Sequence, residues 1–375
     1  MIQDDPISQF LQQAVREGVF PGAVLFVKVK GQVVYHHAVG RMGEAPYEYP
    51  ATTETIYDLA SLTKPLATTT AILCLVQDGR LDLDQPATKW LTEWELTLYK
   101  ATTIRQLLHH SSGLPAYGKY FEALSPTASP PKRASERQAR FEKLLRIIAA
   151  ESIEYLPDSQ SLYSDLGFMA LGAVIERCAG SIVSEFCRDR IYDSLNVNPL
   201  FFIDAEGNPS GGDGNLTHVA PTEQDPWRGR LVHADVHDEN AYALGGITGH
   251  AGLFGTTLSV SRISQAWLQA VLGCSSILPI TLAQQFVKRQ DFSGKSSWAL
   301  GWDTPSAPSS SGNHFSPESF GHLGYAGTSL WIDPVRELEV ILLSNRVHPT
   351  RENKQIEAFR PALHDLLINE LGSNN

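Results

Sequence analysis

The sequence predicts an α+β fold, in which an antiparallel sheet built from both ends of the chain is flanked by helices, with an all-α domain inserted between those ends. Three observations predict it. One pair of strand-like segments lies near the amino terminus, a second pair lies near the carboxyl terminus, and a long stretch between them lacks strand-like alternation. In that order, the segments are residues 22–29 with 32–39, residues 328–333 with 338–344, and residues 83–240.

The amino-terminal part begins with a predicted helix at residues 7–17, where apolar side chains recur every three to four positions. Two strands follow, and the pair Lys30 and Gly31 between them is typical of a tight hairpin turn. Residues 61–77 then carry an apolar helical pattern, and Gly79 is well placed to end that helix.

The rest of the chain is mainly helical until the second strand pair. Helices are predicted at 136–150 and 166–195, and again at 260–272 and 354–371. Residues 204–226 are rich in Gly, Pro, Asn and Asp and predict a long surface loop. Loops of this length in a compact domain are often functional.

These elements predict two structural domains without an internal repeat. Residues 1–62 and 241–375 are expected to form the domain that carries the sheet, and residues 63–240 the inserted, mostly helical domain. We expect the active site to lie between them.

The composition is that of a folded chain and not of a disordered one. Of 375 residues, 42% are hydrophobic and 19% are charged, which is enough apolar material for one large core or two coupled cores. The formal net charge is -11, from 41 acidic and 30 basic residues. Because an acidic surface repels phosphate groups, we expect neither a nucleic-acid nor a membrane partner.

The amino terminus lacks the basic start and apolar stretch of a secretory signal, which favours a cytoplasmic location. A chain from which a signal had been removed would begin in the same way. No run of about 18 apolar residues is present either. The cysteines are scattered without a Cys-x-x-Cys pair and are expected to be structural; they are Cys74, Cys178, Cys187 and Cys274.

The first candidate for chemistry is the pair Ser61 and Lys64. Residues three apart on a helix share a face, so the amine can reach the hydroxyl and take its proton, provided that desolvation lowers the pKa of the lysine. The helix start also favours negative charge that develops at the hydroxyl. The same spacing occurs at Ser129 and Lys132, but the two prolines between them prevent a helical turn.

The second candidate is the pair Tyr163 and Asp165, in a polar stretch directly before the helix predicted from Leu166. A phenol can relay a proton from the nucleophile to a leaving group, and the carboxylate can orient the lysine or hold it charged. Helix capping by Asp165 and simple packing of Tyr163 would explain the same residues.

The third candidate is His322, followed by Leu323 and Gly324. A glycine beside a strand lets a substrate approach closely, and the main-chain N–H of Tyr325 could pair with that of Ser61 as an oxyanion hole. His250 also begins a His-x-Gly pattern. Position favours His322, because it precedes a strand pair, whereas His250 precedes a loop and a helix.

Together these motifs resemble the serine β-lactamases and penicillin-binding proteins, most closely the branch of class C enzymes, esterases and D-aminopeptidases. The likeness covers nearly the whole chain and includes residues 104–114 and 324–334. It implies a β-lactamase/transpeptidase-like fold and an acyl-enzyme mechanism. In that mechanism Ser61 attacks, Lys64 accepts the proton, Tyr163 protonates the leaving group, and water releases the acyl group.

Two positions depart from the family pattern. Asp165 stands where many relatives carry asparagine, which is an accepted variant. His322 and Leu323 replace a lysine and a hydroxyl residue that bind the carboxylate of β-lactams and D-Ala peptides in relatives. Because losing a charged hydrogen bond costs about 1.5–3 kcal/mol, the sequence disfavours efficient β-lactamase action.

Residues 220–254 resemble a branch that includes N-acetylmuramoyl-L-alanine amidases of cell-wall turnover. His237, Asp238 and His250 could line a substrate pocket there, and loop packing with turn capping would explain them equally well. His109 and His110 are expected to be structural.

Other classes fit less well. A zinc hydrolase is disfavoured because the chain has no His-Glu-x-x-His motif, so we expect no metal and no cofactor. An α/β-hydrolase would need Gly-x-Ser-x-Gly, which is absent. The sequence therefore predicts a serine hydrolase of small amides or esters. A cell-wall muropeptide amidase is one form of it, and a carboxylesterase, a weak β-lactamase or a D-aminopeptidase is the alternative. A non-catalytic module that binds peptidoglycan fragments is the alternative from another class.

Overall fold

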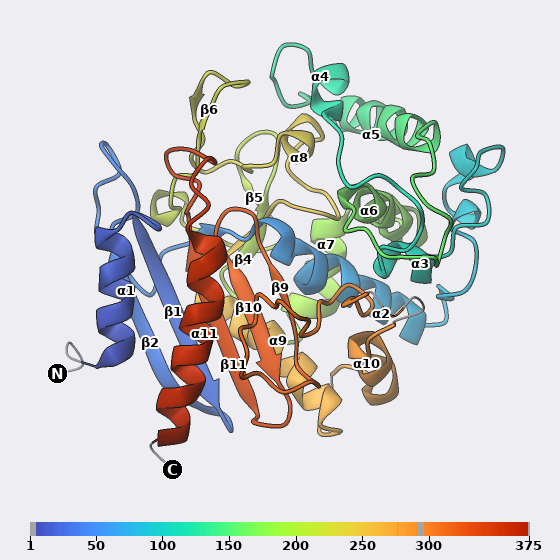
Figure 1. The fold of residues 1–375 in the computed structure, drawn as a ribbon. Helices are drawn as coiled ribbons and strands as arrows, with labels where there is room; N and C mark the ends of the chain where they lie inside the picture. Colours follow the sequence, from blue (N-terminus) through green and yellow to red (C-terminus); the bar gives the residue numbers. More distant parts are fainter. Residues whose placement is uncertain (1–4, 276, 291–293, 295, 374–375) are drawn as a thin grey trace.

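A five-stranded antiparallel sheet forms the centre of one half of the molecule (Figure 1). The computed structural model describes residues 5–275, 277–290, 294 and 296–373. The strand order is β2-β1-β11-β10-β9, so strands from the two ends of the chain lie side by side. Their bounds are β1 Gly22–Val29, β2 Gln32–Gly40, β9 Phe320–Leu323, β10 Ser329–Asp333 and β11 Leu338–Ser344.

The pairing of β1 with β11 joins the two chain ends, with Phe26 opposite Ile341. Side chains alternate between the faces of a strand. Leu25 therefore lies in the core on one face, whereas Val24 and Phe26 lie in the core on the other. Because both faces are covered, β1 and β11 are almost continuously apolar. The α+β fold with a sheet built from both ends, which the sequence predicts, is confirmed.

Helices cover both faces of this sheet (Figure 1). α1 (Pro6–Arg16) and α11 (Ile356–Ser373) lie side by side on one face, where the rings of Phe10 and Phe359 stack with centroids 5.0 Å apart. α9 (Thr257–Val271) packs against the opposite face. The side chain of Asp5 accepts hydrogen bonds from the first turn of α1 and so fixes its start.

The other helices gather beside the sheet. A second sheet, of order β3-β8-β4-β5, pairs strands from residues 57–58 and 253–255 with strands from residues 200–203 and 209–210. The helix bounds are α2 Thr70–Gln77, α3 Ile104–Leu108, α4 Tyr120–Leu124, α5 Ala134–Ala149, α6 Asp165–Ala179, α7 Val183–Cys187, α8 Glu239–Ala243 and α10 Ile280–Val287. The short strands are β3 Tyr57–Asp58, β4 Leu200–Ile203, β5 Pro209–Ser210, β6 Gln224–Asp225, β7 Arg230–Leu231 and β8 Leu253–Gly255.

The segment predicted as one helix at 61–77 is helical but not uniform. A 3-10 turn, η1 (Ala60–Leu62), leads into a π-helical segment, η2 (Lys64–Thr69), before α2 begins. Pro65 lacks an N–H and cannot continue the α-helical hydrogen bonding. π-Helical turns of this kind are frequent at functional sites.

Two further predictions need correction. The helix predicted at 166–195 is divided, because Gly180 adopts a left-handed conformation (φ 78°) that ends α6 before α7 begins. His322 was expected to precede a strand pair, but it lies inside a third strand, β9. That strand has only four residues and contains Gly321, so its pattern is too short to be recognised from sequence.

The cysteines behave as expected: all four are free, and Cys74, Cys178 and Cys187 are buried. Within the residues that the structure describes, no single helix is long and apolar enough to cross a membrane. One bent pair, α6 with the helical segment 183–192, passes that test only when the two parts are taken together.

Candidate active site

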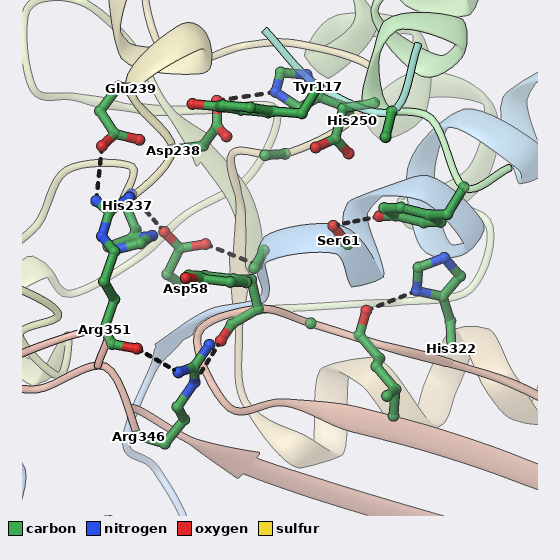
Figure 2. Close-up of a pocket in the computed structure, with 18 of the residues that line it drawn as sticks. Asp58, Ser61, Tyr117, His237, Asp238, Glu239, His250, His322, Arg346 and Arg351 are labelled. Carbon is green, nitrogen blue, oxygen red and sulfur yellow. Dashed lines mark hydrogen bonds and ion pairs between the residues drawn. The ribbon is translucent and has the colours of Figure 1, made fainter. Parts of the chain in front are cut away.

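A cavity of about 960 Å³ lies where the sheet meets the helical region, and Ser61, Tyr163 and His322 line it (Figure 2). This volume is near the upper end for small-molecule sites. The residues that line the cavity come from many separate segments, from Asp58 near the amino terminus to Arg360 in α11. The site therefore exists only in the folded chain.

Ser61 is presented by a sharp turn at the end of β3. Its neighbour Ala60 has a left-handed backbone (φ 48°), which is uncommon for a residue with a Cβ atom. The side chain of Asp58 stabilises that turn, because Oδ1 accepts the Ala60 N–H at 2.8 Å and Oδ2 accepts the His237 N–H at 2.7 Å. Asp58 therefore joins the serine turn to the loop before α8.

Lys64 lies directly beneath Ser61, fully buried. Its Nζ atom donates to Ser61 Oγ at 2.9 Å and to the His250 carbonyl at 3.0 Å, and it lies 2.6 Å from Asp165 Oδ1. Two of these contacts are hydrogen bonds, and the third is an ion pair. One helical turn thus brings the amine and the hydroxyl together, as the sequence predicts.

The protonation of Lys64 is set by two opposing effects. Burial lowers the pKa of Lys64, because an ammonium is poorly solvated there, and the charge of Asp165 opposes part of that shift. The net direction is downward. A lysine with a lowered pKa can lose its proton and accept the one on Ser61.

Tyr163 also contacts the serine, and the Lys64 amine lies over its ring, 4.9 Å from the centroid. Its hydroxyl donates to Ser61 Oγ at 2.8 Å. Burial and the nearby Asp165 carboxylate hold the pKa of Tyr163 well above its usual range, so the phenol keeps its proton. The rings of His110 and Trp298 pack against Tyr163, with centroids 4.8 and 5.4 Å away. His110 thus has the structural role expected of it, since its ring packs against the phenol ring.

His322 lines the cavity (Figure 2), and its ring centroid lies 5.9 Å from that of Tyr163. Its Nδ1 atom lies 2.7 Å from the carbonyl oxygen of Leu323. A carbonyl can only accept, so Nδ1 carries a hydrogen and Nε2 has a free lone pair when the ring is neutral. Burial and the charge of Lys64 lower the pKa of His322 to about 3, so the ring is neutral near pH 7.

His250 and Asp238 form a pair in the cavity wall, and Asp238 also caps a helix. His250 Nε2 lies 2.9 Å from Asp238 Oδ1, which also accepts the Ala241 N–H and so caps α8. Burial alone would raise the pKa of Asp238, but the charge and hydrogen bond of His250 hold it below its usual range. Asp238 therefore both lines the cavity and caps α8, so the two explanations offered by the sequence hold together for this residue.

A network of charged groups extends this wall. His237 Nε2 lies 2.9 Å from Glu223 Oε2, which also accepts from Arg351 Nε at 2.6 Å. Arg351 in turn contacts Glu239 at 2.7 Å. Figure 2 shows His237, Arg351 and Glu239 on the side of the cavity away from His322.

The structure brings the predicted residues together. Ser61, Lys64, Tyr163 and Asp165 are in direct contact, and His322, Gly324, Tyr325, Asp238 and His250 border the same space. Neither Ser129 nor Lys132 is among the described residues that line the cavity.

Sequence reasoning missed several residues that line the cavity. Asp58 lies three positions before Ser61, so its proximity could have been noticed. The others lie far away in sequence and carry no local pattern that marks them: Tyr117, Trp298, Arg346, Arg351 and Arg360.

A buried lysine and a protonated phenol that converge on one serine define a class of enzyme, the serine hydrolases that form an acyl-enzyme with a lysine as base. The sequence matches the family described as Beta-lactamase over residues 7–362. The chain belongs to this family and is one of its serine hydrolases.

Curated relatives agree with this assignment. Two proteins, from Escherichia coli O157:H7 and Escherichia coli K12, are each 30% identical over 371 residues, covering 91% of this chain and 82% of the relative. A protein from Salmonella agona is 29% identical over 330 residues, covering 82% of this chain and 73% of the relative. All three carry the name "Putative D-alanyl-D-alanine carboxypeptidase".

Solved structures share the fold. The octameric penicillin-binding protein homologue from Pyrococcus abyssi has a TM-score of 0.71 at 23% identity, covering 97% of this chain and 77% of that chain. EstCE1, "a hydrolase with promiscuous acyltransferase activity", has a TM-score of 0.70 at 21% identity, with 95% and 97% covered. Simvastatin synthase (LovD) from Aspergillus terreus has a TM-score of 0.70 at 17% identity, with 96% of each chain covered. At these identities the likeness concerns the fold alone.

Proposed function

We propose that this protein cleaves amide or ester bonds of small substrates through an acyl-enzyme on Ser61. The observation that carries the proposal is the convergence of two groups on one atom. Ser61 Oγ lies 2.9 Å from the Lys64 amine and 2.8 Å from the Tyr163 hydroxyl, at the edge of the cavity.

In the acylation step, Ser61 Oγ attacks the carbonyl carbon of the substrate while neutral Lys64 takes the hydroxyl proton. The carbonyl π electrons move to oxygen, and the N–H groups of Ser61 and Tyr325 stabilise the resulting oxyanion. When the oxyanion collapses, the bond to the leaving group breaks, and that group takes the proton of Tyr163. The proton held by Lys64 restores the phenol. The net result is transfer of the serine proton to the leaving group.

In the deacylation step, a water molecule attacks the ester carbon of the acyl-enzyme and loses a proton to neutral Lys64. A second oxyanion forms and collapses, and the bond to Ser61 Oγ breaks. Ser61 then recovers the proton taken from water. The carboxylic acid leaves, and the enzyme returns to its starting state.

The third motif bears on the substrate class. His322 is neutral near pH 7, and Leu323 has no hydroxyl, so neither supplies the charged contact that a β-lactam carboxylate would use. We therefore favour short esters and small amides over β-lactams. Fragments of cell-wall peptide, which the family resemblance and the names of the E. coli relatives both suggest, are the natural amides to test. A carboxylesterase or a D-aminopeptidase is the alternative.

The test combines a covalent probe with a matched pair of variants. A fluorophosphonate should attach one phosphonyl group to the peptide that carries Ser61, as detected by its mass. Ser61→Ala should abolish both this labelling and the turnover of a p-nitrophenyl ester. Ser129→Ala is the control, because that serine has the same spacing to a lysine outside the cavity. Undiminished turnover by Ser61→Ala, or labelling at another serine, contradicts the proposal.

A further inference from the structure

The turn that follows β9 is held by two buried arginines from elsewhere in the chain. Arg360, in α11, donates from one terminal nitrogen to the carbonyls of Gly324 (2.8 Å) and Thr328 (2.7 Å). Arg346, beyond the end of β11, donates from Nε to the Tyr325 carbonyl at 2.9 Å (Figure 2). The carbonyls of this turn therefore face guanidinium groups.

A peptide bond fixes the direction of its two polar groups relative to each other. The Gly324 carbonyl and the Tyr325 N–H belong to one peptide unit, which is not among the cis bonds of the described chain. In a trans peptide the C=O and the N–H point in opposite directions. Because Arg360 holds the carbonyl, the Tyr325 N–H points away from Arg360.

The preceding peptide unit shows which side that is. The Gly324 N–H donates to the Thr328 carbonyl, so the Leu323 carbonyl of the same unit points the other way, toward His322 Nδ1. The Gly324 N–H and the Gly324 carbonyl thus both face the Thr328 and Arg360 side. The Leu323 carbonyl and the Tyr325 N–H consequently face the His322 side, where the cavity and Ser61 lie. None of the hydrogen bonds of the described residues uses the Tyr325 N–H.

Arg360 is an unusual residue to find at this position. It is only 5% exposed, and no ion pair links it to a carboxylate within the described part of the chain. Burial and the charge of Arg346 lower the pKa of Arg360 to about 9. Burying an arginine without a counter-ion is unfavourable, and the contacts that offset this cost are the two carbonyls of the turn.

Gly324 makes such a restraint necessary. A Cβ atom at this position would lie 1.9 Å from Thr328 Oγ1 and 2.6 Å from the Leu59 carbonyl, so only glycine fits. Glycine also has the widest choice of backbone conformations. The Gly327 N–H also donates to the Gly324 carbonyl, at 3.1 Å, so Arg360 supplies the shorter of two contacts to this oxygen. Without Arg360, only this longer bond between two glycines restrains the peptide between residues 324 and 325, which can then rotate and turn its carbonyl, instead of its N–H, toward the developing oxyanion.

We propose that Arg360 is a positioning residue that orients the Tyr325 N–H for the oxyanion hole by fixing the Gly324 carbonyl. The inference rests on the proposed acyl-enzyme function at Ser61. It goes further, because it places part of the control of transition-state stabilisation in α11, a helix that contributes neither the nucleophile nor its base.

The test uses a p-nitrophenyl ester and the matching thionoester, in which sulfur replaces the carbonyl oxygen. Sulfur is a weak hydrogen-bond acceptor, so the thionoester gains little from an oxyanion hole. Arg360→Met removes the guanidinium, while the carbonyls of Gly324 and Thr328 each keep one main-chain N–H donor. His364→Gln is the control. His364 lies one turn further along α11, is fully buried, and contacts only the Ser310 carbonyl among polar groups of the described chain.

For Arg360→Met, kcat for the ester should fall by roughly 10²–10³-fold, the usual loss for one oxyanion-hole donor, with KM little changed. The thionoester rate should fall much less, so the ratio of ester to thionoester rates should drop at least tenfold. For His364→Gln, any loss should be equal for both substrates. Arg360→Gln provides a second variant if Arg360→Met does not fold.

The outcomes separate the two proposals. If the folded Arg360 variants keep the wild-type ratio, with rates unchanged or reduced equally for both substrates, Arg360 has no role in the oxyanion hole and the inference is wrong. If Ser61→Ala still turns over the ester, the proposed function itself fails, whatever the Arg360 variants do.

Discussion

The amine of Lys64 lies 2.6 Å from the carboxylate of Asp165 and 2.9 Å from the hydroxyl of Ser61. One lysine thus contacts both the group that stabilises its charge and the group whose proton it must accept. The burial of Lys64 favours the neutral amine, and Asp165 favours the ammonium. The balance between these two effects decides the pH range in which the site can work.

Replacing the base tests its role directly. Lys64→Met should reduce ester turnover by several orders of magnitude, because no other described side chain except Tyr163 hydrogen bonds to Ser61 Oγ and the phenol keeps its proton. The apolar side chain suits a fully buried position, but Asp165 loses its ion-pair partner, so the thermal unfolding midpoint should fall while the protein stays folded. A variant that is folded and fully active would rule out Lys64 as the base.

The pH dependence follows from the lowered pKa of Lys64. Activity should rise with pH as Lys64 loses its proton, with an inflection below the 10.5 of a free lysine. Asp165→Asn removes the negative charge that favours the ammonium, so the pKa should fall further and the rising limb should move to lower pH by ~1 unit or more. Profiles of kcat/KM for both proteins would measure this shift. If the rising limb of the Asp165→Asn profile stays in place or moves to higher pH, the assignment of that limb to Lys64 is wrong.

The role of Tyr163 can be separated by the choice of leaving group. Tyr163→Phe removes the proton donor that an amine leaving group needs, so amide hydrolysis should fall by roughly 10²–10⁴-fold. Turnover of a p-nitrophenyl ester should fall less, because p-nitrophenolate leaves without a proton. Comparing one amide with one ester of the same acyl group gives the ratio. An equal loss for both substrates would mean that Tyr163 does not protonate the leaving group.

The third motif predicts weak action on β-lactams. Neutral His322 and apolar Leu323 lack the charged contact that a β-lactam carboxylate uses, so nitrocefin turnover should be slow or absent beside hydrolysis of short-chain esters. Leu323→Thr, which restores a hydroxyl to the wall of the cavity, should improve nitrocefin kcat/KM by up to about tenfold. Fast nitrocefin turnover by the unmodified protein would overturn this argument.

Asp58 is expected to support the nucleophile without touching the substrate. Its two oxygens accept the N–H groups of Ala60 and His237. In Asp58→Asn one of these acceptors becomes an NH₂ donor, which leaves a buried N–H unpaired at a cost of about 1–3 kcal/mol. We expect a lower unfolding midpoint and a reduced kcat for esters. An unchanged unfolding curve would show that this contact does not hold the turn.

The strongest local patterns were predictable from sequence. The hairpin of β1 and β2 follows from two strand-like segments around Lys30 and Gly31, and the spacing of Ser61 and Lys64 follows from one helical turn. β9 could not be found in this way, since four residues that contain a glycine carry too little periodicity. The uneven helix at 60–77 was hidden as well, because 3-10, π and α segments share similar apolar patterns.

The sequence by itself determined which reactive groups the chain carries and which local elements present them: a serine and a lysine one turn apart, a phenol at the start of a helix, and a sheet assembled from both chain ends. Only the tertiary structure decided the environment that makes them reactive. Segments far apart in sequence bury Lys64 and bring it into contact with Asp165. They also keep the ring of His322 neutral and place Arg360 in hydrogen-bond contact with the Gly324 carbonyl. Desolvation and hydrogen-bond direction depend on what the folded chain packs around a group, and no local pattern of residues records that.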